Sequence, residues 1–248
     1  MADTDPAAFA SPPDELRSAA EQYFGSHLDL AGRYAVSLAT DGVTRGLIGP
    51  REAGRIWERH LLNCVAIAPA LPPNASVIDV GSGAGLPGIV LAIARPDVRV
   101  DLVEPLARRT GYLTEVVDEL TLGDRVAVVR ARAEEAAAKP TVFHVKQADV
   151  VVSRAVAALD RLAAWCLPLT SVGGTVMALK GSSAAEEVAT HAAAVRRLGG
   201  GQPMLRVYGD VTLPEPTTVV EFVRERVANR TRSAPDVSRT KARRSRRP

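Results

Sequence analysis

The stretch Asp79-Val80-Gly81-Ser82-Gly83-Ala84-Gly85-Leu86-Pro87-Gly88 decides the fold of this 248-residue chain. The apolar residues that lead into it from residue 77 predict a short buried strand, and residues 87–94 predict an apolar helix. Between a strand and a helix, glycine lets the backbone turn sharply and lets a ligand approach without meeting a Cβ atom. Because ligands bind at the carboxyl ends of the strands in open α/β sheets, we expect a ligand site at this loop.

Strand-like and helix-like stretches alternate after the loop. This alternation predicts a mostly parallel, doubly wound α/β sheet with helices on both faces. Two late strands, at 204–208 and 219–227, are expected to pair as a hairpin. The other expected strands are 98–103, 125–129, 149–152 and 174–179, and the expected helices are 14–30, 50–68, 106–120, 155–167 and 182–198.

Two classes of ligand compete for the glycine loop. Dinucleotide sites use G-x-G-x-x-G, whereas the spacing here is G-x-G-x-G two residues after an acid, which is the pattern of S-adenosylmethionine (SAM) sites. Asp79 would favour the sulfonium cation of SAM and would disfavour a pyrophosphate. Glu104 ends the next expected strand, where a carboxylate can accept both ribose hydroxyls of SAM or of NAD. Glu104 therefore does not separate the two cofactors.

The composition is that of a globular chain, with 46% hydrophobic and 24% charged residues. Cys64 and Cys166 cannot make a disulfide framework and lie in apolar helical contexts, so we expect both to be structural. The four histidines show no metal-ligand spacing with the cysteines, and no metal site is expected. Neither a secretory signal nor a membrane span is expected, which predicts a cytoplasmic protein that binds no membrane.

The net charge of +3 is unevenly distributed. Residues 229–248 hold eight basic residues and one acidic residue, a charge of +7, which leaves −4 on residues 1–228. This tail is expected to be disordered when free, and it is either a phosphate-binding arm or a solvated tail. The expected organisation is a flexible N-terminus (1–13), a helical N-terminal extension (14–70), a SAM-binding domain (71–228) and the basic tail (229–248).

Four motifs together resemble the RNA small-subunit methyltransferase G family, also called GidB. They are W-E-R-H-L-L at 57–62, D-V-G-S-G-A-G-L-P-G-I at 79–89, V-S-R-A at 152–155 and A-L-K-G at 178–181. The resemblance covers roughly residues 52–227. It implies a class I SAM-dependent, Rossmann-like methyltransferase that acts on N7 of one guanine in the 530 loop of 16S ribosomal RNA.

The resemblance also assigns the site residues. It implies SAM contacts at Gly81 and Leu86, adenine contacts at Ala133 and Glu134, and a place for Arg154 at the boundary of cofactor and substrate. Departures from the family lie at 28–39 and at 63–64. The full set expected to bind the cofactor is Asp79, Gly81, Gly83, Gly85, Leu86, Glu104, Ala133, Glu134 and Arg154.

Guanine N7 is an in-plane lone pair that attacks without losing a proton. Such an enzyme needs no general base, only positioning, for which Arg154 is the candidate. Arg suits the O6/N7 edge of guanine or a carboxylate, and Lys180 suits a phosphate. A surface cation at a strand end is the alternative for both. The expected RNA contacts are Arg59, His60, Arg108, Arg109, Lys180, Arg243 and Arg244.

These observations predict a monomeric methyltransferase whose partner is 16S ribosomal RNA or the small ribosomal subunit. One alternative is a methyltransferase of the same fold that acts on another RNA or on a small molecule. An NAD(P)-dependent oxidoreductase is disfavoured, because Tyr208 follows Tyr112 as the last tyrosine and has no lysine in a Tyr-x-x-x-Lys pattern. An RNA-binding scaffold without SAM affinity is disfavoured by the intact glycines and Glu104.

Overall fold

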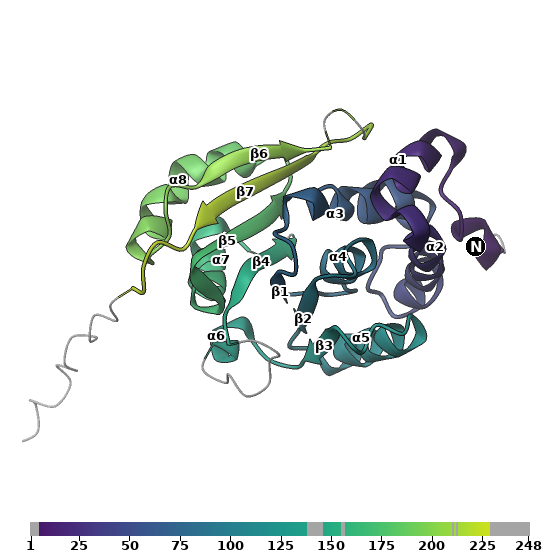
Figure 1. Ribbon diagram of the computed structural model, residues 1–248, viewed down its shortest axis with the longest axis horizontal. Coiled ribbons are helices and arrows are strands. Elements are labelled where there is room, and N and C mark those ends of the chain that lie inside the picture. Colours follow the sequence, from purple (N-terminus) through teal and green to yellow (C-terminus); the bar gives the residue numbers. More distant parts are fainter. Residues whose placement is uncertain (1–4, 138–145, 155–156, 210, 212, 229–248) are drawn as a thin grey trace, which may run out of the picture.

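The computed structural model describes residues 5–137, 146–154, 157–209, 211 and 213–228. Within them, one sheet has the strand order β3-β2-β1-β4-β5-β7-β6 (Figure 1). The strands β1 to β5 run parallel, and β7 runs antiparallel to both β5 and β6. The strands are β1 (Ser76–Val80), β2 (Arg99–Val103), β3 (Val126–Val129), β4 (Ala148–Arg154), β5 (Thr170–Lys180), β6 (Met204–Tyr208) and β7 (Thr217–Val223).

The mostly parallel sheet and the late hairpin are confirmed by this topology. Strand order reverses between β1 and β4, since β2 and β3 lie on one side of β1 and the later strands on the other. Ligands bind at such a switch point in open α/β sheets, outside the carboxyl ends of the strands. The loop after β1 leaves the sheet at this place.

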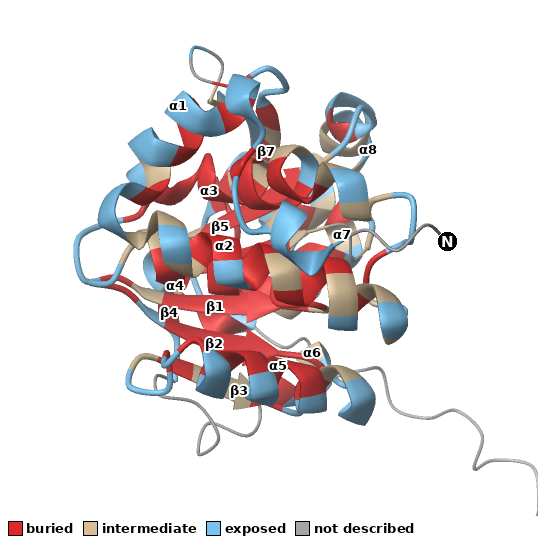
Figure 2. Ribbon diagram, turned by 90° about the vertical axis from the view of Figure 1, so that its right-hand side faces the viewer, coloured by how far each residue is buried: buried red, intermediate tan, exposed pale blue. Residues whose placement is uncertain are grey.

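Helices cover both faces of the sheet, and the central strands between them are buried (Figure 2). Successive residues of a strand enter different cores. Val77 packs with the helices of one face and Ile78 with those of the other. The first face holds α1 (Asp14–Phe24), α2 (Leu28–Ser37), α3 (Asn63–Val65), α4 (Gly88–Ala94) and α5 (Ala107–Glu119). The second face holds α6 (Ala133–Ala136), α7 (Leu159–Cys166) and α8 (Ala184–Arg197).

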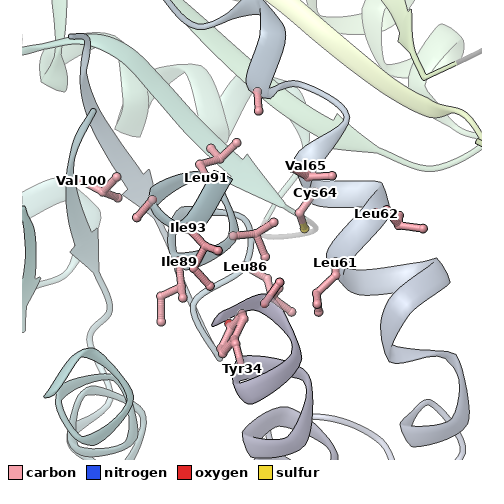
Figure 3. Close-up of a cluster of buried hydrophobic side chains, with 14 of the residues drawn as sticks. Tyr34, Leu61, Leu62, Cys64, Val65, Leu86, Ile89, Leu91, Ile93 and Val100 are labelled. Carbon is pink, nitrogen blue, oxygen red and sulfur yellow. The ribbon is translucent and has the colours of Figure 1, made fainter. Parts of the chain in front are cut away.

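The N-terminal helices share the core of the first face. Tyr34 from α2 and Leu61 point toward Leu86 and Ile89, which flank the start of α4 (Figure 3). All four side chains are buried. This packing brings residues far upstream of the glycine loop into contact with it.

Two expected helices are interrupted. The helix expected at 14–30 stops at Gly25, which has a φ of 50°, and resumes after a 3-10 turn, η2 (Gly25–His27). The helix expected at 50–68 is a 3-10 turn, η4 (Ala53–Arg55), a π-helix, η5 (Ile56–Leu62), and the short α3. A π-helix widens the turn, and here it buries Trp57 and His60 together with the predicted apolar positions.

The remaining short helices are the 3-10 turns η1 (Pro6–Phe9), η6 (Ala68–Ala70) and η8 (Leu167–Leu169), and a second π-helix, η3 (Leu38–Gly42). None of the helices in the described ranges has the length and hydropathy of a membrane span.

Candidate functional site

Three glycines of the loop have backbone conformations that favour glycine. The φ angles are 74° at Gly81, 60° at Gly83 and 98° at Gly85, all in the left-handed region. The backbone N–H groups of Gly81 and Ser82 donate to the carbonyl of Val103 at 2.8 and 3.2 Å, which ties the loop to the end of β2. The loop is therefore held against the carboxyl ends of two adjacent strands.

Gly85 is also confined by its surroundings. A Cβ atom at this position would lie 2.4 Å from Cδ1 of Ile89 and 2.9 Å from the hydroxyl of Tyr34. That hydroxyl donates to the carbonyl of Ala84 at 2.7 Å, so α2 is attached to the loop through Tyr34. No sequence motif marks Tyr34, although the buried residues of α2 recur at helical spacing.

Asp79 does not face the ligand side of the loop. Its carboxylate is fully buried, and Oδ2 accepts a hydrogen bond from the N–H of Gly88 at 3.0 Å, at the start of α4. Oδ1 has no hydrogen-bond partner among the described residues. The expectation of a carboxylate beside a cationic ligand is thus replaced by a contact within the loop and its helix.

Burial raises the pKa of Asp79 to about 7. An unfolded aspartate ionises near pH 4, so between pH 4 and 7 the folded chain binds the extra proton. This carboxyl therefore contributes stability at low pH that is lost as the pH rises to about 7.

Asp79→Asn is expected to remove this pH dependence, since an amide has no proton to lose and can still accept from Gly88. From pH 5 to pH 8, the free energy of unfolding of the variant should rise relative to that of the original chain by about 2–3 kcal/mol. Urea unfolding of both proteins at the two pH values measures this difference. A constant difference would show that Asp79 is ionised throughout.

A cavity of about 510 Å³ opens beside the loop, at the carboxyl ends of the central strands. Its size lies within the range of small-molecule sites, roughly 300–1,000 Å³. Two other cavities in the described part of the chain, of about 600 and 560 Å³, include none of the loop residues. The lining of the 510 Å³ cavity beside the loop is Leu47, Ile48, Gly81, Ser82, Gly83, Ala84, Leu86, Glu104, Pro105, Leu106, Arg109, Arg132 and Arg154.

Glu104 lies in the wall of this cavity, at the carboxyl end of β2. Only 1% of the residue is exposed, and both carboxylate oxygens accept backbone hydrogen bonds at 3.1 Å, Oε2 from Gly83 and Oε1 from Leu106. Nη1 of Arg109 lies 3.5 Å from Oε2. The carboxylate is therefore fixed in one orientation against the glycine loop.

Arg154 enters the cavity from the end of β4. Its Nη1 donates to the carbonyl of Arg59 at 3.2 Å, and its Nη2 lies 2.9 Å from Nδ1 of His60. Arg154 therefore links the π-helix η5 to the cavity. Arg59 and His60 do not themselves line it.

Lys180 does not provide a cation for the cavity. Its side chain is 7% exposed, and Nζ donates to the carbonyl of Ala157 at 2.6 Å and to Oε2 of Glu187 at 2.8 Å. The expected contact of Lys180 with a phosphate is therefore replaced by a partly buried ion pair with Glu187 of α8, on the second face of the sheet.

The other expected site residues are distributed around the cavity. Arg109 lines it, whereas Arg108 is exposed on α5 outside the lining. Ala133 and Glu134 begin α6 directly after the lining residue Arg132, but neither is in the lining. Arg243 and Arg244 lie outside the described residues.

The cavity is also lined by residues that no sequence motif predicts. Leu47 and Ile48 come from the N-terminal region, and no motif points to them. Leu106 lies two residues after Glu104, and Arg132 directly precedes Ala133. Their closeness to these expected site residues is the sequence signal that could have identified them.

Neither cysteine has the environment of a nucleophile. Both are fully buried, and burial raises the pKa of Cys64 to about 11 and the pKa of Cys166 well above its usual range. Their expected structural role agrees with this burial.

The region of this chain that matches known proteins includes the four sequence motifs. The sequence model of the GidB family, described as rRNA small subunit methyltransferase G, matches residues 27–209. Curated relatives named ribosomal RNA small subunit methyltransferase G include one from Salinispora tropica, 58% identical over 92% of this chain and 95% of the relative, and one from Rhodococcus jostii, 55% identical over 86% and 91%. A solved structure of P. horikoshii TYW2 in complex with MeSAdo has a TM-score of 0.50 at 15% identity, covering 67% of this chain and 63% of that one, and shows the same fold.

Proposed function

This chain belongs to the family of rRNA small subunit methyltransferase G, and from this premise we propose that it transfers a methyl group from SAM to N7 of a guanine in the 530 loop of 16S ribosomal RNA. The observation that carries the proposal is the juxtaposition of two left-handed glycines, Gly81 and Gly83, with the buried carboxylate of Glu104 in one wall of the cavity.

The cavity fits a ligand with a ribose. A Cβ atom on Gly83 would meet only the carbonyl oxygen of Gly81, at 3.8 Å, so the space beside this glycine is open. The Glu104 carboxylate is held by two backbone N–H groups, and a carboxylate at this strand end can accept two adjacent hydroxyls. Leu86 and Ile48 add apolar surface.

When bound, SAM supplies an electrophilic methyl group on its sulfonium. The chain's own contribution is to bind, orient and exclude water. Glu104 would hold the ribose, the glycine loop would approach the cofactor closely, and Arg154 would orient an oxygen acceptor of the cofactor or the base. Guanine N7 loses no proton on attack, so this assignment asks no side chain to act as a general base.

Arginines around the cavity suit a polyanionic substrate. Arg109 and Arg132 line it, and Arg108 directly precedes Arg109 in the sequence. We place the substrate in the small ribosomal subunit or its RNA, the protein in the cytoplasm, and the chain as a monomer. The basic tail with Arg243 and Arg244 would add phosphate contacts that weaken with salt.

The oxidoreductase alternative gains no support from Tyr208. Its hydroxyl donates to Glu221 across β6 and β7, and neither residue lines the cavity beside the glycine loop.

Gly83→Asp is expected to abolish SAM binding, because the new side chain would fill the approach to the loop and would place a second carboxylate beside Glu104. Gly83→Asn is the matched control, since Asn and Asp tolerate a left-handed φ similarly. Calorimetric titration with SAM should show no binding for the Asp variant and weakened binding for the Asn variant. Micromolar affinity in the Asp variant would contradict the assignment of the loop.

The same two variants test the reaction. Transfer of labelled methyl from SAM to small ribosomal subunits that lack the modification should be absent with Gly83→Asp and reduced with Gly83→Asn, and it should not occur with fully modified subunits. Equal labelling of both kinds of subunit would contradict the proposed substrate.

A further inference from the structure

The guanidinium of Arg154 is held on one side by the π-helix η5. One of its N–H groups donates to the carbonyl of Arg59 at 3.2 Å, and another lies 2.9 Å from Nδ1 of His60. A guanidinium has five N–H donors and no acceptor, so Nδ1 of His60 must be the acceptor and carries no proton. The guanidinium also interacts with the Cys64 thiol, and Arg154 itself lines the cavity beside the glycine loop.

The tautomer of His60 follows from this contact. With Nδ1 as an acceptor, the ring proton of the neutral imidazole resides on Nε2. Nε2 is buried, and Oε2 of Glu52 lies 3.5 Å from it, which is long for a direct hydrogen bond. The carboxylate of Glu52 therefore faces the N–H side of the ring.

The charged groups around His60 keep it neutral. Arg154 and Arg59 disfavour a second positive charge, and Glu52 opposes them, with its Oε1 also 3.7 Å from Nη1 of Arg59. Burial is the largest effect, and together these groups lower the pKa of His60 to about 4. The imidazole remains an acceptor for Arg154 at neutral pH.

We propose that His60 and Glu52 are positioning residues, which fix the Arg154 guanidinium so that its other N–H groups face an oxygen acceptor in the cavity. This inference rests on the proposed function. The acceptor has one chemistry and two sources, the carboxylate of the bound SAM or the O6 edge of the target guanine. His60 and Glu52 touch neither ligand and act through Arg154.

Substitutions of His60 that remove or keep an acceptor for Arg154 test the positioning role. His60→Leu should lower kcat/KM for methyl transfer by about 30-fold or more, because Arg154 loses the partner that orients it. His60→Asn should restore the rate to within about fivefold, since its amide oxygen can take the place of Nδ1. His191→Leu is the matched control, because His191 lies on α8 at the second face, 3.8 Å from Asp160.

The two sources of the acceptor give different kinetic results. If Arg154 faces the SAM carboxylate, His60→Leu should raise the dissociation constant for SAM by the same factor. If Arg154 faces the guanine, that constant should stay within about twofold and the loss should appear in kcat or in the KM for the small subunit. Either result supports the positioning role.

A double-variant cycle tests whether His60 acts through Arg154. In an Arg154→Ala background, His60→Leu should change kcat/KM by less than about twofold. Glu52→Gln should lower kcat/KM less than His60→Leu does, since it leaves the acceptor nitrogen in place. Equal effects of His60→Leu in both backgrounds, or a loss of stability with unchanged kinetics, would overturn the proposal.

The positioning role and the proposed function can fail separately. Nitrogen-15 NMR of the histidine rings should show His60 protonated at Nε2 only, with Arg154→Ala removing this preference. A His60 ring protonated at Nδ1 would overturn the positioning role even if methyl transfer is observed. Absence of transfer by the original chain, with this NMR signature intact, would contradict only the proposed function.

Discussion

Replacing Glu104 with alanine is expected to weaken the binding of SAM by about 100-fold or more. A hydrogen bond to a charged group contributes about 1.5–3 kcal/mol, and the carboxylate would accept two from the ribose. The substitution also leaves the N–H groups of Gly83 and Leu106 without their acceptor, which loosens the loop. Isothermal titration with SAM measures the loss.

Two controls separate the cofactor contact from general damage. Glu104→Gln keeps the shape and one acceptor oxygen, and it should lose about tenfold in affinity. Glu115→Ala removes an exposed carboxylate on α5 that pairs with Arg45, and it should leave the affinity unchanged. Unchanged affinity in a folded Glu104→Ala variant would contradict the ribose assignment.

Gly85→Ala is expected to destabilise the fold by about 2–5 kcal/mol. The substitution forces an L-residue into a left-handed conformation, which costs roughly 1–2 kcal/mol, and it also drives a Cβ atom into Ile89 and the Tyr34 hydroxyl. Because Tyr34 anchors α2 to the loop through Ala84, the shift should also loosen that helix. Urea unfolding measures the loss of stability.

Gly83→Ala is the matched comparison within the same loop. Gly83 also has a positive φ, 60° against 98° at Gly85, but a Cβ atom there would meet only the carbonyl oxygen of Gly81, at 3.8 Å. It should therefore cost only the conformational part, about 1–2 kcal/mol. Equal losses at Gly83 and Gly85 would show that the packing of Tyr34 and Ile89 against the loop adds nothing.

The sheet and the loop were predictable because local patterns determine them. Apolar runs marked the strands, and glycine spacing marked the turn in which Gly81, Gly83 and Gly85 all adopt left-handed conformations. The position of Glu104 in the cavity wall was predictable for the same reason, since it follows the strand beside that loop.

The rest of the cavity depends on contacts between distant parts of the chain. Ile48 reaches the cavity only because the N-terminal helices pack on α4, and no residue pattern near it marks a ligand. Lys180 ends a strand as expected, but its ammonium group pairs with Glu187 in α8, the next helix. Asp79 turns toward the start of α4 rather than toward the cavity. A single sequence does not reveal which of several nearby partners a charged side chain takes.

Helical spacing around residues 56–65 identified the buried face but not the π-helix. Within this π-helix, Nε1 of Trp57 donates to the carbonyl of Phe9, and Nδ1 of His60 accepts from Arg154. Both contacts join segments that lie far apart in the sequence.

Mapping the methylated nucleotide tests the proposed reaction most directly. Small ribosomal subunits that lack the modification would be incubated with the protein and labelled SAM, and the labelled base and atom would then be identified. We expect label at N7 of one guanine in the 530 loop of 16S ribosomal RNA and none with the Gly83→Asp variant. Label on another base or atom, or no transfer by a protein that still binds SAM, would contradict the proposed function.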